Sequence, residues 1–437
     1  GHGKLDFALD WVGLTSDYLA TNASLAAAGA TMSGTLGVFV TDTISFHDTN
    51  VRVKHLDTRT IQQVFPTIKS PRQGYLTGRI AATGGFGALK LDADASFADR
   101  ISGTSRVIAR GTVGATRGVV IARDLHLTFA PLQVALARSV DPALPIGGTL
   151  TGKVLLNGTT ATRLTGSGDL IHDDVTGRSH ITGSGAFASG GRVPFVNANV
   201  QLLPLSLATV GQFAPAAGLR GSVSGPVSLT GPMSNLAVAA SLVTPDGGSI
   251  TTNGTLDLSV KPQAYDLSMV AHLFDVSQIT SKAPSTSLSL EIAARGAGFD
   301  PATLTSTATA TARASVYDSV SVDSAVVRLA AANGMLRVDT LALNIPNGHA
   351  NAAGTIGLVA GSVGKLKYDV AVDSLSSLSR VLPPADTGLV RPRPAILAQR
   401  VSRADSARAQ VARATQVERA VTSKPMPSFP VGTPRAI

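Results

Sequence analysis

The sequence predicts an all-β protein with a few short helices, built as a long, curled, open antiparallel β-sheet of repeats whose apolar side forms a groove. Three observations lead to this fold class: little charge and aromatic bulk, a glycine-punctuated segment that recurs, and alternation of apolar and polar residues within each copy. The chain has 437 residues, of which 15% are charged and 4% aromatic, whereas an average domain is about 25% charged. The chain is also long for one compact core.

The recurring segment has the spacing Gly, three residues, Gly, five residues, Gly. Its three copies are GYLTGRIAATG at 74–84, GTLTGKVLLNG at 148–158 and GSVSGPVSLTG at 221–231. A fourth copy, TSLSLEIAARG, ends at Gly296 and lacks the first two glycines. The middle glycines are Gly78, Gly152 and Gly225, at intervals of 74 and 73 residues.

One side of each copy is apolar and the other polar, which is the two-residue period of a half-buried strand. We predict that the apolar side lines the groove and contacts lipid. The residues assigned to this lining are Leu76, Ile80, Leu150, Val154, Leu156, Val223, Val227, Leu229, Leu288 and Ile292. The middle glycines share the apolar side, where a missing side chain is expected to let the wall fold inward.

The second copy also begins like a phosphate-binding loop, Gly147-x-x-x-x-Gly152-Lys153, but Val154 stands where that loop needs Ser or Thr. A phosphate-binding loop leads into a helix, whereas the residues after Gly152 continue the alternation of a strand. The other copies do not repeat the lysine. We therefore interpret this segment as a strand and not as a nucleotide site.

A short helix-like segment precedes each copy and stops at proline, which disfavours helix at the residue before it. These segments end at Pro66, Pro142, Pro215 and Pro284, and a fifth ends at Pro383. Units made of a helix and several strands stack in one direction. The predicted groove domain is 1–385, with units at roughly 55–130, 131–203, 204–273 and 274–372, and with roughly 30 strands of typical length.

The remaining polar clusters give no sign of catalysis. The segment from His172 to Asp174, together with His180, has a metal-like composition but is interpreted as a hairpin connection. Asp92 and Asp94 alternate along a strand and are expected on its wet side. We predict no enzyme activity, no cofactor and no metal.

The net charge of +9 is concentrated in the last fifty residues, where nine Lys or Arg after position 388 face only Asp405 and Glu418. We expect 386–437 to be a basic linker, or an amphipathic helix resting on an anionic membrane surface or a partner. Its apolar stripe consists of Leu397, Val401, Ala404, Ala407, Val411, Ala414, Val417 and Val421. Nucleic-acid binding is not expected, because Phe429 is the only aromatic residue there.

The chain begins Gly-His-Gly-Lys without an initiator Met and contains no apolar run of about 18 residues. We expect a fragment of a longer protein, with any export signal or membrane anchor outside it.

A long apolar face must be covered, and four or five short helices are too few to cover it. Lipid tails would suit such a surface, because each buried CH₂ contributes about 0.8 kcal/mol. The alternative is a structural or adhesive cell-surface protein, such as a β-solenoid passenger domain with parallel strands. The long unit and the predicted hairpin turns at Asn253-Gly254, Asn333-Gly334 and Asn347-Gly348 favour antiparallel strands instead.

The glycine-rich strands, the short helices ending in proline and the segment GMLRVDTLALNIPNGHANAAGTIGL at 334–358 resemble the AsmA-like and TamB proteins of the bacterial envelope over roughly 1–385. The resemblance implies a bridge-type lipid transfer protein that spans the periplasm, is anchored in the inner membrane outside this chain, and moves phospholipid between the inner and outer membranes. It also implies a role in outer-membrane biogenesis. For the TamB branch, it implies an Omp85-type outer-membrane barrel as partner and a link to autotransporter assembly.

Overall fold

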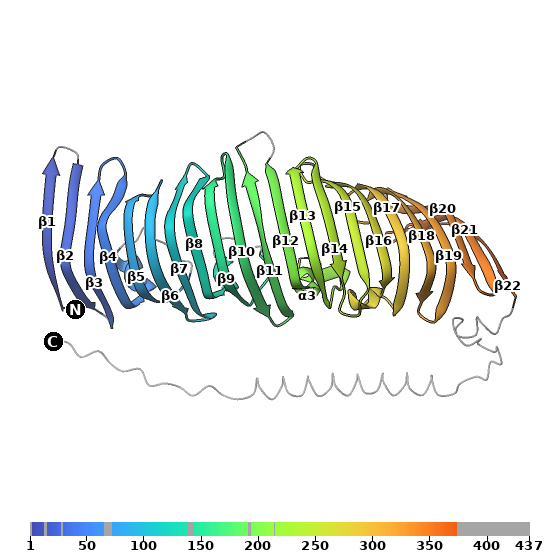
Figure 1. Cartoon of the computed structure of the whole chain (residues 1–437), viewed down its shortest axis with the longest axis horizontal. Coiled ribbons are helices and arrows are strands. Elements are labelled where there is room, and N and C mark those ends of the chain that lie inside the picture. The colour runs from blue at the N-terminus through green and yellow to red at the C-terminus, as the bar shows by residue number, and fades with distance from the viewer. Residues whose placement is uncertain are drawn as a thin grey trace, which may run out of the picture. The chain divides into compact units, whose positions relative to one another are not determined.

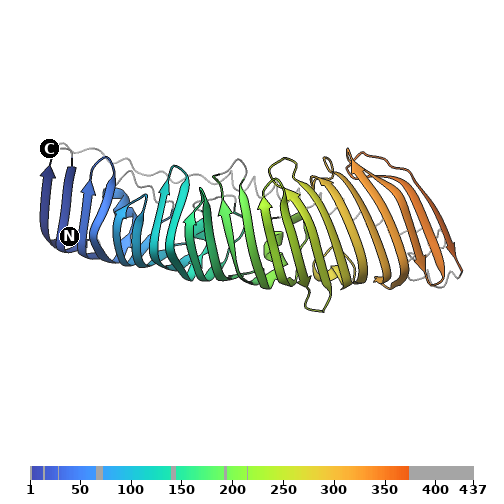
Figure 2. The ribbon, with the colours of Figure 1, turned by 45° about the horizontal axis from the view of Figure 1, so that its top comes forward.

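The protein is a single open antiparallel sheet, as the sequence predicts. A computed structural model describes residues 2–12, 15–27, 29–64, 72–138, 144–190, 194–213 and 215–373. Residues Gly1–Leu375 form one compact unit, and its described residues contain a 22-stranded sheet. Figures 1 and 2 show the strands side by side in chain order along a curled ribbon that does not close. Every described pairing is antiparallel.

The first eleven strands are β1 His2–Val12, β2 Thr15–Ala27, β3 Ala30–Val40, β4 Ile44–Asp57, β5 Gly74–Gly85, β6 Leu89–Asp99, β7 Gly103–Thr116, β8 Val119–Gln133, β9 Thr149–Thr159, β10 Arg163–Asp174 and β11 Gly177–Ala188. The others are β12 Phe195–Ser206, β13 Ser222–Pro232, β14 Leu236–Val243, β15 Ser249–Asp257, β16 Ala264–Phe274, β17 Thr286–Ala297, β18 Thr305–Tyr317, β19 Val320–Ala332, β20 Met335–Ile345, β21 Gly348–Gly357 and β22 Leu366–Val372. The helical segments are α1 Thr58–Val64, α2 Val134–Ala137, α3 Leu207–Gly211 and the 3₁₀ turns η1 Pro215–Ala217 and η2 Val276–Gln278.

A helical segment follows every fourth strand from β4 to β16, at the places where the sequence predicts helices ending in proline. The last of these, η2, is a 3₁₀ turn and not an α-helix. The segment ending at Pro383 lies outside the described residues, as does the tail 386–437. The described strands number 22, against roughly 30 expected, because most of them are longer than the typical five or six residues.

Two details of the predicted hairpins need correction. Asn253-Gly254 lies inside β15 and not at a turn, and Gly254 takes a φ of +155° within the strand. Asn333-Gly334 is a turn with both φ values positive, as predicted for this pair. The third turn is centred on Pro346 and Asn347, so Gly348 already belongs to β21.

The last strand of each four-strand group carries a β-bulge where it pairs with the first strand of the next. On β8 the register moves from Phe129↔Gly152 to Leu132↔Leu150, so three residues on one strand match two on the other. The equivalent shifts follow Val53↔Gly78, Leu202↔Gly225 and Ala271↔Leu290. A bulge bends its strand and increases local twist, so the curl of the ribbon has a regular source every fourth strand.

Buried serines satisfy backbone N–H groups beside two of these bulges and beside a further bulge between β17 and β18. Each side-chain oxygen accepts a hydrogen bond from a nearby backbone N–H, at 2.9 to 3.0 Å. The pairs are Ser105 with Gln133, Ser179 with Ser206, and Ser315 with Ser289. An unpaired buried N–H would cost about 1–3 kcal/mol, which explains the need for a small hydroxyl residue at these positions.

The repeated middle glycine has a backbone role as well as a packing role. Gly152 has a φ of +134°, and a Cβ there would lie 2.0 Å from the carbonyl oxygen of Asp169 on β10. Gly78 and Gly225 also have positive φ and equally close backbone neighbours. The glycine therefore permits the close approach of strands beside the bulge.

We predict that Gly152→Ala lowers the free energy of unfolding by about 1–3 kcal/mol, because it forces a side chain into a left-handed conformation and against a carbonyl oxygen. The control is Gly168→Ala on β10, where φ is ordinary and the nearest atom is 3.3 Å from the added Cβ. Urea unfolding followed by circular dichroism measures both. Equal losses in the two variants would contradict the role assigned to Gly152.

Candidate functional site

A continuous row of apolar residues crosses the sheet from strand to strand. In an antiparallel pair, residues directly opposite each other point to the same face, so the register identifies the row without ambiguity. The row holds Val51, Ile80, Ala93, Ala109, Leu127, Val154, Gly168, Gly183, Val200, Val227, Ala240, Thr252, Met269, Ile292, Ala310, Val327, Leu341, Ala352 and Tyr368. Thr252 is its only residue of clearly polar type apart from the hydroxyl of Tyr368.

Two further apolar rows flank this central row on the same face. One passes from Gly152 through Leu170, Ile181 and Leu202 to Gly225. The other consists of Leu125, Leu156, Gly166, Gly185, Ala198, Leu229, Val238, Gly254, Leu267, Ala294, Ala308, Leu329, Val338, Gly354 and Leu366. Since two residues along a strand span roughly 6.6 Å, the three rows form an apolar strip roughly 13 Å wide between the outer two. We call this strip the groove.

The opposite face is polar over the same strands. The row displaced by one residue from the central row holds Asp92, Arg110, His126, Leu155, Ser167, Ser184, Asn199, Ser228, Ala239, Asn253, Ser268, Ala293, Thr309, Arg328 and Thr340. Charged, amide and hydroxyl side chains dominate it. The sheet therefore has one face suited to water and one that is not.

The groove is open along its length in the described part of the protein. Its central row is half-buried, except that Ala93 and Ala109 are buried and Tyr368 is exposed. No large described side chain is fully buried anywhere. Neighbouring groove residues shield one another only partly, so the described residues form no covering layer over the apolar strip.

The structure places six of the ten predicted lining residues in these rows. Ile80, Val154, Val227 and Ile292 belong to the central row, and Leu156 and Leu229 to a flanking row. The other four lie toward the helix-bearing edge, each opposite an apolar residue of the preceding strand. These pairs are Leu76 with Leu56, Leu150 with Leu132, Val223 with Leu205, and Leu288 with Phe274.

One long edge of the groove is thickened by the helical segments, which lie along it in Figures 1 and 2. At α3, the Gln212 side-chain amide donates to Asp174 Oδ2 at 3.0 Å, and the hydroxyls of Thr176 and Thr209 are 3.0 Å apart. Asp174 shares the groove side of β10 with Leu170, because the two are four residues apart. The helical edge therefore forms a rim on the groove side.

Three aspartates fix this rim, and each has a pKa below its ordinary value. Desolvation raises the pKa of Asp275, but hydrogen bonds from the Thr286 N–H and from Ser277 outweigh it. Asp174 and Asp99 show the same competition between burial and hydrogen bonds. Arg72 adds an ion pair with Asp99 at 3.2 Å and donates to the carbonyl oxygen of Ala135 in α2 at 2.7 Å. These carboxylates serve as structural acceptors at the rim.

The polar residues that the sequence analysis considered for catalysis or metal binding lie on the outer face or form hydrogen bonds within the sheet. Asp94 lies on the outer face, where the hydrogen bond from Arg106 lowers its pKa, so it is not held protonated as a general acid. His172 and His180 belong to the predicted hairpin, formed by β10 and β11. His172 Nε2 lies 2.7 Å from the Gly147 carbonyl oxygen, and His180 pairs with Asp169 at 2.7 Å. No group of three potential metal ligands occurs among the described residues.

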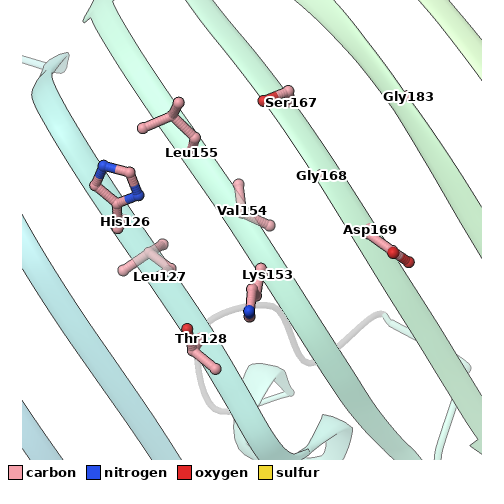
Figure 3. A pocket seen from close by; sticks show the side chains of 10 residues that line it. All are labelled: His126, Leu127, Thr128, Lys153, Val154, Leu155, Ser167, Gly168, Asp169 and Gly183. Carbon is pink, nitrogen blue, oxygen red and sulfur yellow. The ribbon is translucent and has the colours of Figure 1, made fainter.

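Figure 3 shows the middle of the sheet, where a shallow pocket of about 290 Å³ lies. Lys153 and Asp169 are register partners on the outer side, while Val154 belongs to the groove row. Gly168 and Gly183 have no side chains, so the backbone of the sheet is uncovered at these two positions. Lys153 lies within β9 and is followed by more strand, so the segment that resembled a phosphate-binding loop is a strand, as predicted.

The sequence pattern missed the groove residues of the intervening strands. Leu127, Met269 and Leu341 occupy the central row but lie between the recurring segments, and the prediction used only the first strand of each group. Apolar and polar residues alternate around each of them. Bulges interrupt this alternation on β8 and β20, however, so counting residues along the sequence does not show which face of the sheet each side chain occupies.

No family model, curated protein or solved structure matches the chain.

None of the described helices has the length and apolar character needed to cross a membrane.

We expect one described pair, His47 and Asp17, to make the stability of the sheet depend on pH. His47 on β4 reaches over Gly37 to Asp17 on β2, with Nε2 2.7 Å from Oδ1, and its Nδ1 lies 3.3 Å from Asp48 Oδ2. The hydrogen bond with Asp17, and then that with Asp48, raises the pKa of His47 above its ordinary value of 6.5. A group whose pKa is higher in the folded state than in the unfolded state stabilises the fold at pH values below its unfolded-state pKa. This stabilisation is lost as the pH rises through its folded-state pKa.

We predict that Asp17→Asn destabilises the protein at about pH 5.5, where the imidazole is protonated in the folded state, and has a smaller effect at about pH 8.5, where deprotonation of the imidazole weakens its pairing with Asp17. Urea unfolding of both proteins at the two pH values measures the difference. The substitution Asp6→Asn, on the neighbouring strand β1, serves as a control. An effect of Asp17→Asn that is independent of pH would show that the pair contributes no charge-dependent stability.

Proposed function

We propose that the groove carries the acyl chains of phospholipids, and that the protein is a bridge along which lipid moves between two membranes. The observation that carries this proposal is the central apolar row, which continues across nineteen strands from Val51 to Tyr368. A site for one bound molecule would be bounded by polar residues at both ends. This row has no such boundary among the described strands.

The apolar lining of the groove suits movement of a lipid along it better than tight binding of one lipid at a fixed place. Each methylene removed from water contributes about 0.8 kcal/mol, so a lipid whose tails lie in the groove stays stable there. Because each next strand offers a similar set of Val, Leu, Ile and Ala side chains, moving by one strand exchanges one apolar contact for another. The lipid headgroup would stay in water at the open mouth, and no covalent step is needed.

The dimensions of the sheet support a bridge. Twenty-two strands spaced about 4.8 Å apart extend over roughly 100 Å, far more than the length of one lipid. A compact carrier would enclose its cargo. An open strip of this length suits several lipids in single file.

We further propose that the protein is an AsmA-like or TamB-type component of the bacterial envelope, acting in the periplasm in outer-membrane biogenesis. The four-strand groups with their edge helices, and the open groove, support this assignment. In this proposal an inner-membrane anchor lies outside the chain, and an Omp85-type barrel receives the other end. The link to outer-membrane protein and autotransporter assembly belongs to the same proposal.

The alternative of an adhesive or structural surface protein has less support. A β-solenoid passenger domain is built from parallel coils, whereas all described strand pairs here are antiparallel. An adhesin also has no need of an uncovered apolar strip, which is an aggregation hazard unless something occupies it.

We predict that Val227→Glu reduces the phospholipid retained by the full chain, because it weakens acyl-chain binding over its own stretch of the groove about tenfold, equivalent to about 1.4 kcal/mol. A carboxylate in the central row keeps its hydration and excludes acyl chains from that stretch. The protein is incubated with phosphatidylglycerol vesicles and repurified, and the bound lipid is then quantified by mass spectrometry.

The matched control is Ser228→Glu, which places the same charge one residue away on the outer face. It should leave lipid retention unchanged. Both variants should keep the circular dichroism of a β-sheet. Equal retention by Val227→Glu and the unsubstituted chain, or equal losses in both variants, would refute the groove as the lipid-binding face.

A further inference from the structure

The groove is not uniform, and its floor is bare at one place near the middle of the sheet. On β10 and β11, two successive groove positions are glycine on both strands, forming the register pairs Gly166↔Gly185 and Gly168↔Gly183. Val154 flanks them on β9 and Val200 on β12. A hollow of about 250 Å³ lies over these glycines. We call it the recess.

The bare floor is particular to this four-strand group. The position equivalent to Gly168 is Ala93, Ala240 and Ala310 in the other groups, and the position equivalent to Gly183 is Ala109, Thr252 and Val327. In the other groups, the sheet therefore accommodates side chains at these positions. Nowhere else among the described strands do four groove-facing glycines lie together.

Backbone geometry explains only part of this cluster. A Cβ on Gly183 would lie 2.3 Å from the carbonyl oxygen of Asn199, so that residue must be glycine. A Cβ on Gly168 meets nothing closer than 3.3 Å, and a Cβ on Gly166 first meets the flexible end of Leu156 at 3.0 Å. Neither residue has a φ that requires glycine. The absence of side chains at these two positions is therefore a property of the surface and not a demand of the fold.

The shape and chemistry of the recess indicate its occupant. Its walls are Val154, Leu170, Ile181 and Val200, and its floor is formed by the four glycines with Ala198, Ser167 and Ser184. An apolar cavity of about 150 Å³ binds benzene, so this larger hollow has room for a hydrocarbon segment beyond six carbons. It has no charged wall residue to hold a headgroup.

We propose that the recess is a resting site for the acyl chain of a phospholipid, where lipid in the groove stays longest. This rests on the proposed lipid-carrying function and adds a preferred position within it. A chain segment in the recess contacts walls and floor at once, whereas elsewhere in the row it contacts a flatter surface. The occupancy of acyl chains should therefore peak over β10 and β11.

The test uses phosphatidylglycerol with a photoactivatable diazirine in its acyl chain, loaded onto the full chain from vesicles. After illumination and digestion, mass spectrometry compares labelling of residues 163–188 with that of 305–332, the equivalent hairpin two groups along. We expect about fivefold more label at 163–188, which corresponds to about 1 kcal/mol. Equal labelling of the two hairpins would overturn the proposal while leaving the lipid-carrying function intact.

Variants of the recess provide the second arm. Gly168→Val fills it and should bring the two hairpins to equal labelling, and Gly168→Ala, the residue of the equivalent positions, should do so in part. Ile181→Ala enlarges it and should raise the label at 163–188. The control Ala310→Val adds bulk at the equivalent position and should leave that label unchanged. If a folded Gly168→Val variant still carries more label at 163–188 than at 305–332, the proposed resting site is wrong. If the chain loads no lipid at all, both proposals are wrong.

Discussion

The lateral register of the antiparallel strands is the constraint on which the rest of this structure depends. Each strand must place its apolar residues opposite those of its two neighbours, because a slip of one residue would turn a whole strand's apolar side toward water. The bulges do not break this rule. Each adds one residue where the strand bends, and the apolar rows resume beyond it, as at Phe129 and Leu132. Curvature and a continuous apolar face are therefore compatible in one sheet.

The register also explains how a sheet with so few large buried side chains keeps its form. The described residues form no second layer for the sheet to pack against, so local interactions take the place of a core. Hydroxyls such as Ser179 satisfy N–H groups at bulges, glycines such as Gly152 allow close strand contact, and aspartates such as Asp275 hold the helical rim. The glycines recur every four strands, on β5, β9 and β13, and each of these interactions stabilises only its own neighbourhood, as in other repeat proteins.

The sequence predicted the open antiparallel sheet because the first strand of each group alternates without interruption. Val154 and Val227 could thus be assigned to the groove face. The central row could not be followed from the sequence alone, because residues in αL conformation, such as Asp124 and Leu273, shift the alternation within the last strand of a group. Asn253-Gly254 also looked like a hairpin turn, although the pair lies within β15, where Gly254 approaches the backbone of Asp266. The number of strands was overestimated because most described strands are longer than the typical five or six residues.

The central claim is that one face contacts lipid along the whole sheet and the other does not. The chain contains no cysteine, so a polarity-sensitive fluorophore can be attached to single cysteines at adjacent residues on opposite faces, with the labelled pairs being Ile80 and Arg79, Val154 and Lys153, and Ile292 and Glu291. Emission is then recorded before and after adding phospholipid vesicles. The account predicts a blue shift at all three groove positions and none at their outer-face neighbours. A shift on both faces, or at only one of the groove positions, would contradict it.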